Sequence, residues 1–117
     1  MGASKIETYN QPLMNLANYE DLKCLGGLLK NYDNLRLLAE KGDTVGSAIY
    51  IDLKVALEKG ILTNLQKECI YRYFVYRSTL REIAEHLDKS IPTVADHIKG
   101  GVKRIQKAFI SGALYHD

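Results

Sequence analysis

Apolar positions in the second half of the chain repeat every three or four residues, which is the spacing of one face of an α-helix. Two of these stretches begin at a capping box, formed by Thr63 with Gln66 and by Thr79 with Glu82. In such a box, each side chain accepts a hydrogen bond from a free backbone N–H at the helix start. The first box predicts a helix over about residues 64–75.

The second box opens a helix of little more than two turns, because its apolar positions run out before Asp88. Ser90 is a good N-cap for the helix after it, and Pro92 is tolerated only in a first helical turn. This third helix is predicted over about residues 91–109, with an apolar stripe made by Ile91, Val94, Ile98, Val102, Ile105 and Phe109. Only three residues separate the last two helices, and so short a joint is typical of a helix-turn-helix.

The face of the third helix opposite its apolar stripe is basic. Lysines on this face can meet phosphates, while short polar side chains near its N-terminal end can approach base edges in the major groove. A solvated surface helix would show the same two faces, but the capped helix directly in front favours DNA binding. The candidate DNA-binding residues are Ser90, Ile91, Pro92, Thr93, Asp96, Lys99, Lys103, Arg104 and Lys107.

The stretch TLREIAEHLDKS, followed by PTVADHI and VKRIQKAF, resembles the helix-turn-helix of sigma factor region 4, which reads the promoter element farther upstream. LTNLQKECIYRYF is similar to the helix that opens the same module. The recognition helix of LuxR-type regulators is also matched, by Ser90, Thr93, Val94, His97 and Ile98. The resemblance covers about residues 61–110.

This resemblance implies an all-α fold, in which N-terminal helices pack on a C-terminal helix-turn-helix of sigma region 4 type. It implies a sequence-specific DNA-binding transcription regulator, with double-stranded DNA as partner and RNA polymerase as a second candidate partner. No stretch matches the separate domain with which a complete sigma factor grips core polymerase and melts the promoter. The length and layout resemble the small sigma-like regulators of phages and mobile elements of Gram-positive bacteria.

The charge distribution agrees with DNA binding, although the net charge of the 117 residues is only +2. Residues 61–110 carry nine Lys and Arg against five Asp and Glu, whereas residues 1–60 carry seven against eight. No apolar run approaches the ~18 residues of a membrane span, and no basic-then-apolar leader starts the chain. We therefore expect one soluble, cytoplasmic domain.

The cysteines and histidines of the chain lack the spacing of a metal site or a catalytic site. Cys24 and Cys69 are far apart and have no partners at metal-ligand spacing, so each is expected to be a small core residue. His97 lies near the edge of the buried stripe, where it is expected to pack. No phosphate loop, nucleophile elbow or carboxylate pair is present. The sequence thus predicts no enzyme, no metal and no cofactor.

The first part of the chain is less strongly patterned. Residues 1–11 are polar and expected to be frayed, and Pro12 could open a first helical turn. A broad apolar stripe then predicts a helix over about residues 19–41 that closes at Gly42. Two glycines in its middle, Gly26 and Gly27, each cost about 1 kcal/mol of helix propensity. They indicate a kink, a close helix contact or a split into two helices.

Residues 45–59 fit two patterns. Ile49, Ile51, Leu53, Val55 and Leu57 alternate with more polar positions as in a strand, whereas Ile49, Leu53, Ala56 and Leu57 suit a helix that Gly60 ends. Because no second strand exists for pairing, we expect a helix.

The predicted organisation is an N-terminal helical segment over 1–60, a helix-turn-helix module over 61–110 and a C-terminal tail over 111–117. The N-terminal helices can serve as a lid over the rear of the module, or their broad stripe can contact polymerase or a second copy in a homodimer.

Asp96 keeps an alternative function open, since a carboxylate repels phosphates unless it accepts a hydrogen bond from a cytosine amino group. In that alternative the fold binds RNA polymerase or another protein without reading DNA.

Overall fold

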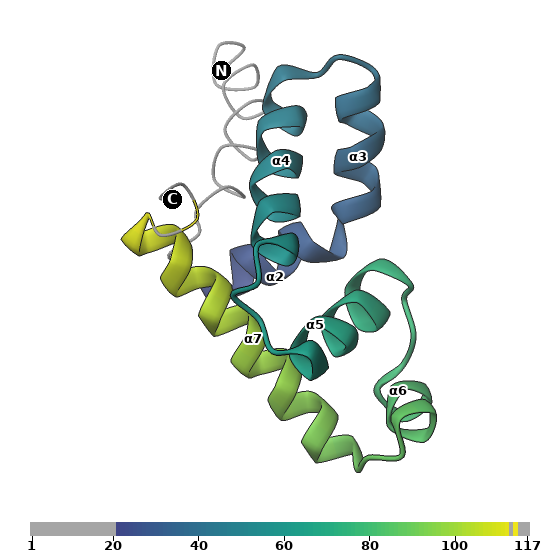
Figure 1. The fold of residues 1–117 in the computed structure, drawn as a ribbon. Coiled ribbons are helices and arrows are strands. Elements are labelled where there is room, and N and C mark those ends of the chain that lie inside the picture. The colour runs from purple at the N-terminus through teal and green to yellow at the C-terminus, as the bar shows by residue number, and fades with distance from the viewer. Residues whose placement is uncertain (1–20, 113, 115–117) are drawn as a thin grey trace, which may run out of the picture.

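The computed structural model describes residues 21–112 and 114. These residues form six α-helices and one π-helix, and no strand occurs among them, so the predicted all-α fold is confirmed (Figure 1). The elements are α2 (Leu22–Lys30), α3 (Tyr32–Glu40), α4 (Thr44–Glu58), α5 (Asn64–Ile70), η1 (Tyr71–Val75), α6 (Leu80–Leu87) and α7 (Ile91–Ser111). The predictions for residues 1–11 and for a helix start at Pro12 lie outside the described residues.

The ambiguous stretch before residue 60 is helix α4. Its N-cap is Asp43, whose side chain accepts a hydrogen bond from the Gly46 amide at 2.7 Å. The positions that suited a helix are buried, whereas Ile51, which fitted only the strand pattern, is 52% exposed. The helix ends before Gly60, whose φ of 82° is the left-handed conformation that glycine adopts readily.

The long stripe predicted over residues 19–41 forms two helices, and the break lies at Asn31 rather than at the glycine pair. The Asn31 side chain donates a hydrogen bond to the carbonyl of Gly27 at 2.8 Å. A short amide side chain that bonds to nearby backbone competes with helix continuation, and this favours an interruption at Asn31. The predicted end of the stripe is confirmed, because α3 ends at Glu40 and Gly42 has a φ of 85°.

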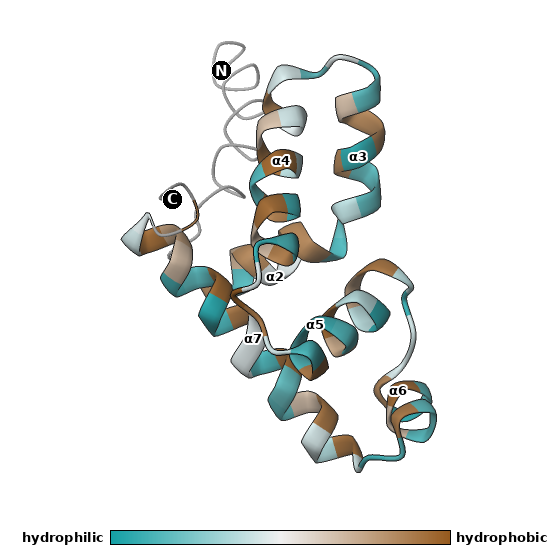
Figure 2. Cartoon of the chain, in the orientation of Figure 1, coloured by the Kyte–Doolittle hydropathy of each residue, from teal (hydrophilic) through white to brown (hydrophobic). Residues whose placement is uncertain are grey.

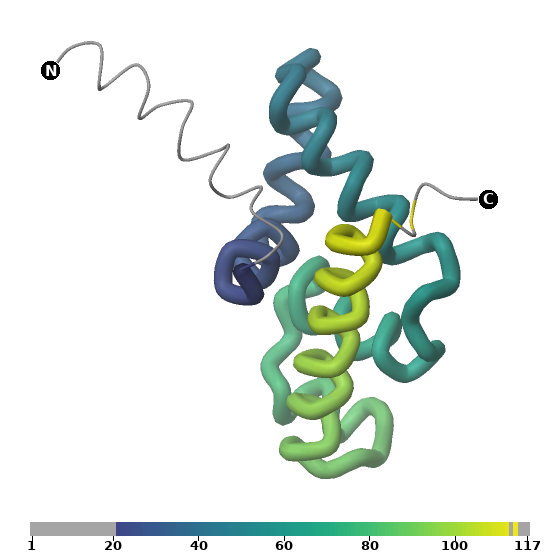
Figure 3. Tube along the Cα trace, turned by 90° about the vertical axis from the view of Figure 1, so that its left-hand side faces the viewer, coloured from purple at the N-terminus to yellow at the C-terminus, as the bar shows by residue number. Residues whose placement is uncertain are grey.

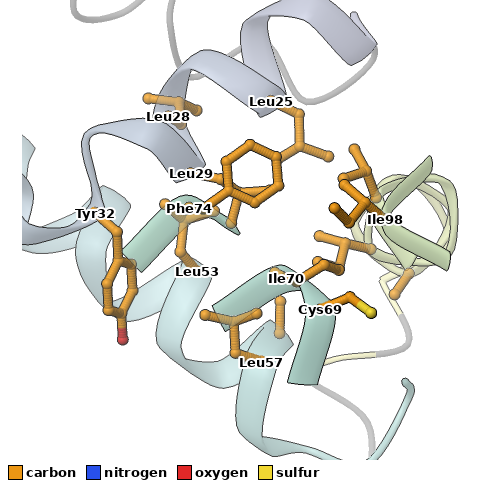
Figure 4. Close-up of a cluster of buried hydrophobic side chains, with 14 of the residues drawn as sticks. Leu25, Leu28, Leu29, Tyr32, Leu53, Leu57, Cys69, Ile70, Phe74 and Ile98 are labelled. Atoms are coloured by element: carbon orange, nitrogen blue, oxygen red, sulfur yellow. The ribbon is translucent and has the colours of Figure 1, made fainter. Parts of the chain in front are cut away.

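The N-terminal helices pack against the rear of the C-terminal helices, as expected. Figures 1 and 3 show α3 and α4 as a helical hairpin at one end, with α2 beside the long α7 and α6 at the other end. Figure 4 shows Ile70 and Phe74 of α5 and η1 between leucines of α2 and α4, among them Leu25 and Leu53. One hydrophobic cluster thus joins both parts of the chain.

Much of the apolar stripe over residues 19–41 is buried against other helices of the same chain. Leu25, Leu28, Leu29, Tyr32 and Leu35 are buried in the common core. The lid over the rear of the C-terminal helices is therefore the arrangement found. Leu114 beyond α7 is buried in the same core.

The helix that opens the C-terminal module spans the predicted range 64–75, but its last part is a π-helix. The amide of Tyr76 donates to the carbonyl of Tyr71, five residues earlier, at 3.0 Å. Phe74 enters the core, whereas Tyr76 is 66% exposed. Cys69 is buried in the same core, Cys24 is half-buried, and neither forms a disulfide.

Candidate nucleic-acid interface

Helices α6 and α7 meet through the three-residue joint that the sequence predicts. The capping box of α6 has both bonds: the Glu82 amide donates to Thr79 Oγ1 at 3.1 Å, and the Thr79 amide donates to Glu82 Oε1 at 2.8 Å. Helix α6 stops at Asp88, whose φ of 55° is left-handed. The amide of Lys89 then donates to the carbonyl of Ala84 at 2.9 Å, which closes the helix end and sets the direction of the chain into α7.

Ser90 is the N-cap of α7, as predicted. Its Oγ accepts a hydrogen bond from the Thr93 amide at 3.2 Å, and it lies 2.7 Å from Thr93 Oγ1, so the two hydroxyls share a second bond. Pro92 occupies the first turn, where its missing N–H costs nothing. The helix runs to Ser111, two residues beyond the predicted end, and Gly112 closes it with a φ of 73°.

The inner face of α7 is buried in the hydrophobic core. Val94 and Ile105 are completely buried, and Ile98 and Val102 are nearly so. Helices α5 and α6 both pack against α7, and the buried Ile83 of α6 belongs to the same cluster. His97 is half-buried, at the edge of this face. The opposite face of α7 is consequently fixed in direction and turned outward.

All nine candidate DNA-binding residues lie on the first turn or the outer face of α7. Eight of them are exposed, whereas Thr93 is half-buried and bonded to Ser90. Figure 2 shows that hydrophilic and hydrophobic residues alternate along the whole length of α7. The eight exposed residues are Ser90, Ile91, Pro92, Asp96, Lys99, Lys103, Arg104 and Lys107.

The charge on this face is positive and is not neutralised by ion pairs within the described part of the chain. The ion pairs found there join Arg36 to Asp33 and Glu40, and Arg72 to Glu68. The four cations of the α7 face therefore remain available to an anionic partner. Asp96 is the one carboxylate on this face among the described residues of α7.

Two further lysines, on α2, lie next to the α7 cations, and sequence reasoning missed both. Lys23 and Lys30 line the same groove as Lys99 and Lys103. About seventy residues separate the two pairs along the chain, so no local pattern could have brought them together. A smaller groove farther along α7 joins Leu22 of α2 to Lys103, Arg104 and Lys107.

Arg72 ties the opening helix of the module to α6. Its guanidinium lies 2.8 Å from Glu68 Oε1 and 2.7 Å from Nε2 of His86. Arg77, in the link between η1 and α6, donates to the carbonyl of Lys30 at 2.8 Å. The Arg72 bonds join elements within the module, and the Arg77 bond connects the module to the end of α2.

The described residues contain no cluster of three or more His, Cys, Asp or Glu side chains that could hold a metal ion. Among the same residues, no helix combines the length and the apolar character that crossing a membrane requires.

Residues 60–107 match the family described as sigma-70, region 4. This part of the chain, which contains α5, η1, α6 and most of α7, is therefore similar to sigma region 4, and the match supports a DNA-binding helix-turn-helix. Neither the comparison with curated proteins nor the comparison with solved structures gave a match.

Proposed function

We propose that this protein, whose residues 60–107 form a sigma region 4-like helix-turn-helix, is a sequence-specific DNA-binding transcription regulator. In this proposal α7 is the recognition helix and its N-terminal turns enter the major groove. The observation that carries the proposal is the outer face of α7: it is exposed, basic and held in a fixed direction by a buried inner face.

The length of that face assigns different roles to its two ends. From Thr93 to Lys107 the helix rises about 21 Å, at about 1.5 Å per residue, whereas the major groove is about 12 Å wide. Only the first turns can therefore lie over base edges. Lys103, Arg104 and Lys107 reach beyond the groove, where the phosphate backbone runs, and Lys99 lies at the boundary.

Near the bases, the polar candidates differ in what they can offer. Asp96 is exposed and can accept a hydrogen bond from a cytosine amino group. The Thr93 hydroxyl already shares a bond with Ser90, so it reads a base only with its remaining hydrogen-bonding capacity. Ile91 is 39% exposed and can touch a thymine methyl group.

The biological setting is part of the same proposal. The sigma region 4-like module supports RNA polymerase as a second partner, and the proposed setting is the cytoplasm, in a regulator of phage or mobile-element origin. A homodimer would place two α7 helices on one DNA site, and sedimentation of the protein with and without DNA measures that state.

DNA binding itself is tested by titrating labelled double-stranded DNA at several salt concentrations. Replacing Lys99, Lys103 or Arg104 singly by Ala should weaken binding to all sequences by a similar factor and reduce the salt slope by about one unit. Lys41→Ala and Lys54→Ala are matched controls, because both lysines are exposed on or next to the α3–α4 hairpin, away from α6 in Figure 1.

Two results would contradict the proposal. If a variant lost binding to one preferred site but kept its nonspecific binding, the replaced residue would not be a phosphate contact. If the parent protein failed to bind double-stranded DNA even at low ionic strength, the function would be that of a protein-interaction module.

A further inference from the structure

A groove of about 660 Å³ lies between α2, η1 and α7, beside the basic face of α7. Phe74 of η1 and Val102 of α7 are its most deeply buried lining residues, and Leu22 of α2 contributes an exposed leucine at its edge. Pockets that hold small ligands are typically about 300–1,000 Å³ and mostly apolar, with a few placed polar groups. The groove has both the size and the apolar floor of such a site.

The α2 side of the groove is formed by Gly26 and Gly27. Glycine inside a helix costs about 1 kcal/mol relative to alanine, and a close approach of another element is the usual structural reason for it. That reason is absent, because a β-carbon added at either glycine would have no neighbour within 4 Å. The missing side chains instead leave space on this wall of the groove, so an occupant could approach the backbone of α2.

The rim of the groove is positively charged. Four lysines line it, Lys23 and Lys30 from α2 and Lys99 and Lys103 from α7, and no carboxylate is found among the described lining residues. The ion pairs within the described part of the chain involve none of the four. An occupant that matches this surface needs an apolar body for the floor and an anionic group for the rim.

We propose that this groove is a binding site for a small amphipathic anion, with an aromatic or aliphatic body against Phe74 and Val102 and an acidic group among the four lysines. The volume fits one such molecule, and the open wall at Gly26 and Gly27 admits its body. The site is formed jointly by the N-terminal helix α2 and the sigma region 4-like module.

Occupancy of this site opposes DNA binding, and this second step rests on the proposed function. Lys99 and Lys103 serve both surfaces: they line the groove and they belong to the basic face of α7. An anion held between them and the α2 lysines neutralises part of the charge that would otherwise meet phosphates. The groove then acts as an effector site that lowers DNA affinity.

The site is tested with 8-anilinonaphthalene-1-sulfonate, which combines an aromatic body with one sulfonate and fluoresces when it leaves water. We expect saturable binding at one site per chain, displaced by a medium-chain fatty acid such as decanoate. Gly26→Leu places a side chain in the open wall and should abolish this binding. Lys23→Gln combined with Lys30→Gln should weaken it at least several-fold.

The matched charge control is Lys41→Gln combined with Lys54→Gln, which removes two exposed lysines that do not line the groove and should leave probe binding unchanged. Circular dichroism of every variant establishes that it is folded. Non-saturable binding by the parent, or parent-like binding by a folded Gly26→Leu variant, would overturn the proposed site.

The coupling is measured separately, by titrating DNA with and without a saturating concentration of the probe. The parent should bind DNA several-fold more weakly when the probe is present, whereas Gly26→Leu should show no such change. Unchanged DNA affinity of the probe-saturated parent would overturn the coupling. If the protein bound the probe but no DNA at all, the proposed function and the coupling would fail, and the groove site would stand on the fluorescence data.

Discussion

Ile70 of α5 lies directly against Gly101 of α7, so closely that a β-carbon added to this glycine would stand 2.5 Å from the Cδ1 atom of Ile70. Both residues are buried, and Ile70 is completely inaccessible to solvent. This contact sets how closely the opening helix of the module approaches the recognition helix. A glycine in the middle of α7 therefore has a packing reason, in contrast to the two glycines of α2.

Replacing glycine by alanine should therefore have opposite effects on stability at Gly101 and at Gly26. Gly101→Ala should lower the free energy of unfolding by up to about 2 kcal/mol, because overpacking costs about 1–3 kcal/mol and the gain in helix propensity offsets about 1 kcal/mol of it. Gly26→Ala should raise the free energy of unfolding by about 0.5–1 kcal/mol, since the added methyl group meets open space. Urea unfolding of both variants measures the two values. A stabilised Gly101→Ala variant would show that the δ-methyl of Ile70 moves aside freely.

The capping box of α6 should make stability depend on pH. The hydrogen bond from the backbone N–H of Thr79 to the Glu82 carboxylate, helped by the Thr79 side chain, lowers the pKa of Glu82 below its ordinary value. The stabilisation is complete above the ordinary glutamate pKa of about 4.3 and is lost as the pH falls through the lower, folded-state pKa. Glu82→Gln is the matched variant, because glutamine can still accept the bond from Thr79 but does not titrate.

The stability difference between the parent and Glu82→Gln should therefore be constant near neutral pH and change only below the ordinary glutamate range. Urea unfolding at a series of pH values measures this difference. An NMR titration of the Glu82 side chain with a midpoint at or above the ordinary value would contradict the assignment of the bond.

The contact between α6 and α7 should dominate the stability of the helix-turn-helix. Val94→Ala and Ile83→Ala should each cost about 1–4 kcal/mol, because both side chains are buried and their truncation leaves cavities. Loss of DNA binding should follow unfolding, as measured by circular dichroism and DNA titration on the same samples. A well-folded variant of either kind that no longer bound DNA would mean that the inner face itself contacts DNA.

Base reading should reside at the N-terminal end of α7. Selection of binding sites from random DNA should show that Asp96→Ala relaxes the preference at one or two adjacent base pairs by about 1–3 kcal/mol each. Its affinity for random DNA should stay constant or rise, because a carboxylate that repels phosphates has gone. Thr93→Ala should relax an adjacent position in the same way, but it also removes the hydroxyl bonded to Ser90 and should lower helix stability.

If both variants kept the site preference of the parent, α7 would not read bases directly. Specificity would then lie in DNA shape or in a partner such as RNA polymerase. Ser90→Ala is the control for the loss of helix stability in Thr93→Ala. It removes the N-cap of α7 but leaves the Thr93 side chain in place.

The sequence alone determined the local structure of the module, because each signal there acts between residues a few positions apart. The boxes at Thr63 and Thr79, the cap at Ser90 and the end at Asp88 all occur where the sequence predicts them. Helical periodicity likewise separated the buried and exposed faces of α7 from Val94 to Ile105, whereas Ile91, which the predicted stripe includes, is 39% exposed in the first turn. Caps and periodicity are properties of the chain itself, so one sequence is enough to read them.

Only the tertiary structure decided features that depend on distant partners. The break of the stripe over residues 19–41 is an exception, because the bond from the Asn31 side chain to the carbonyl of Gly27 is local, but the glycine pair is the more obvious interruption in the sequence. The sequence does not show that Gly101 is needed for packing while Gly26 borders an open groove, because the difference lies in what each faces. The grouping of Lys23 and Lys30 with Lys99 and Lys103 has the same origin, since it exists only once α2 has packed beside α7.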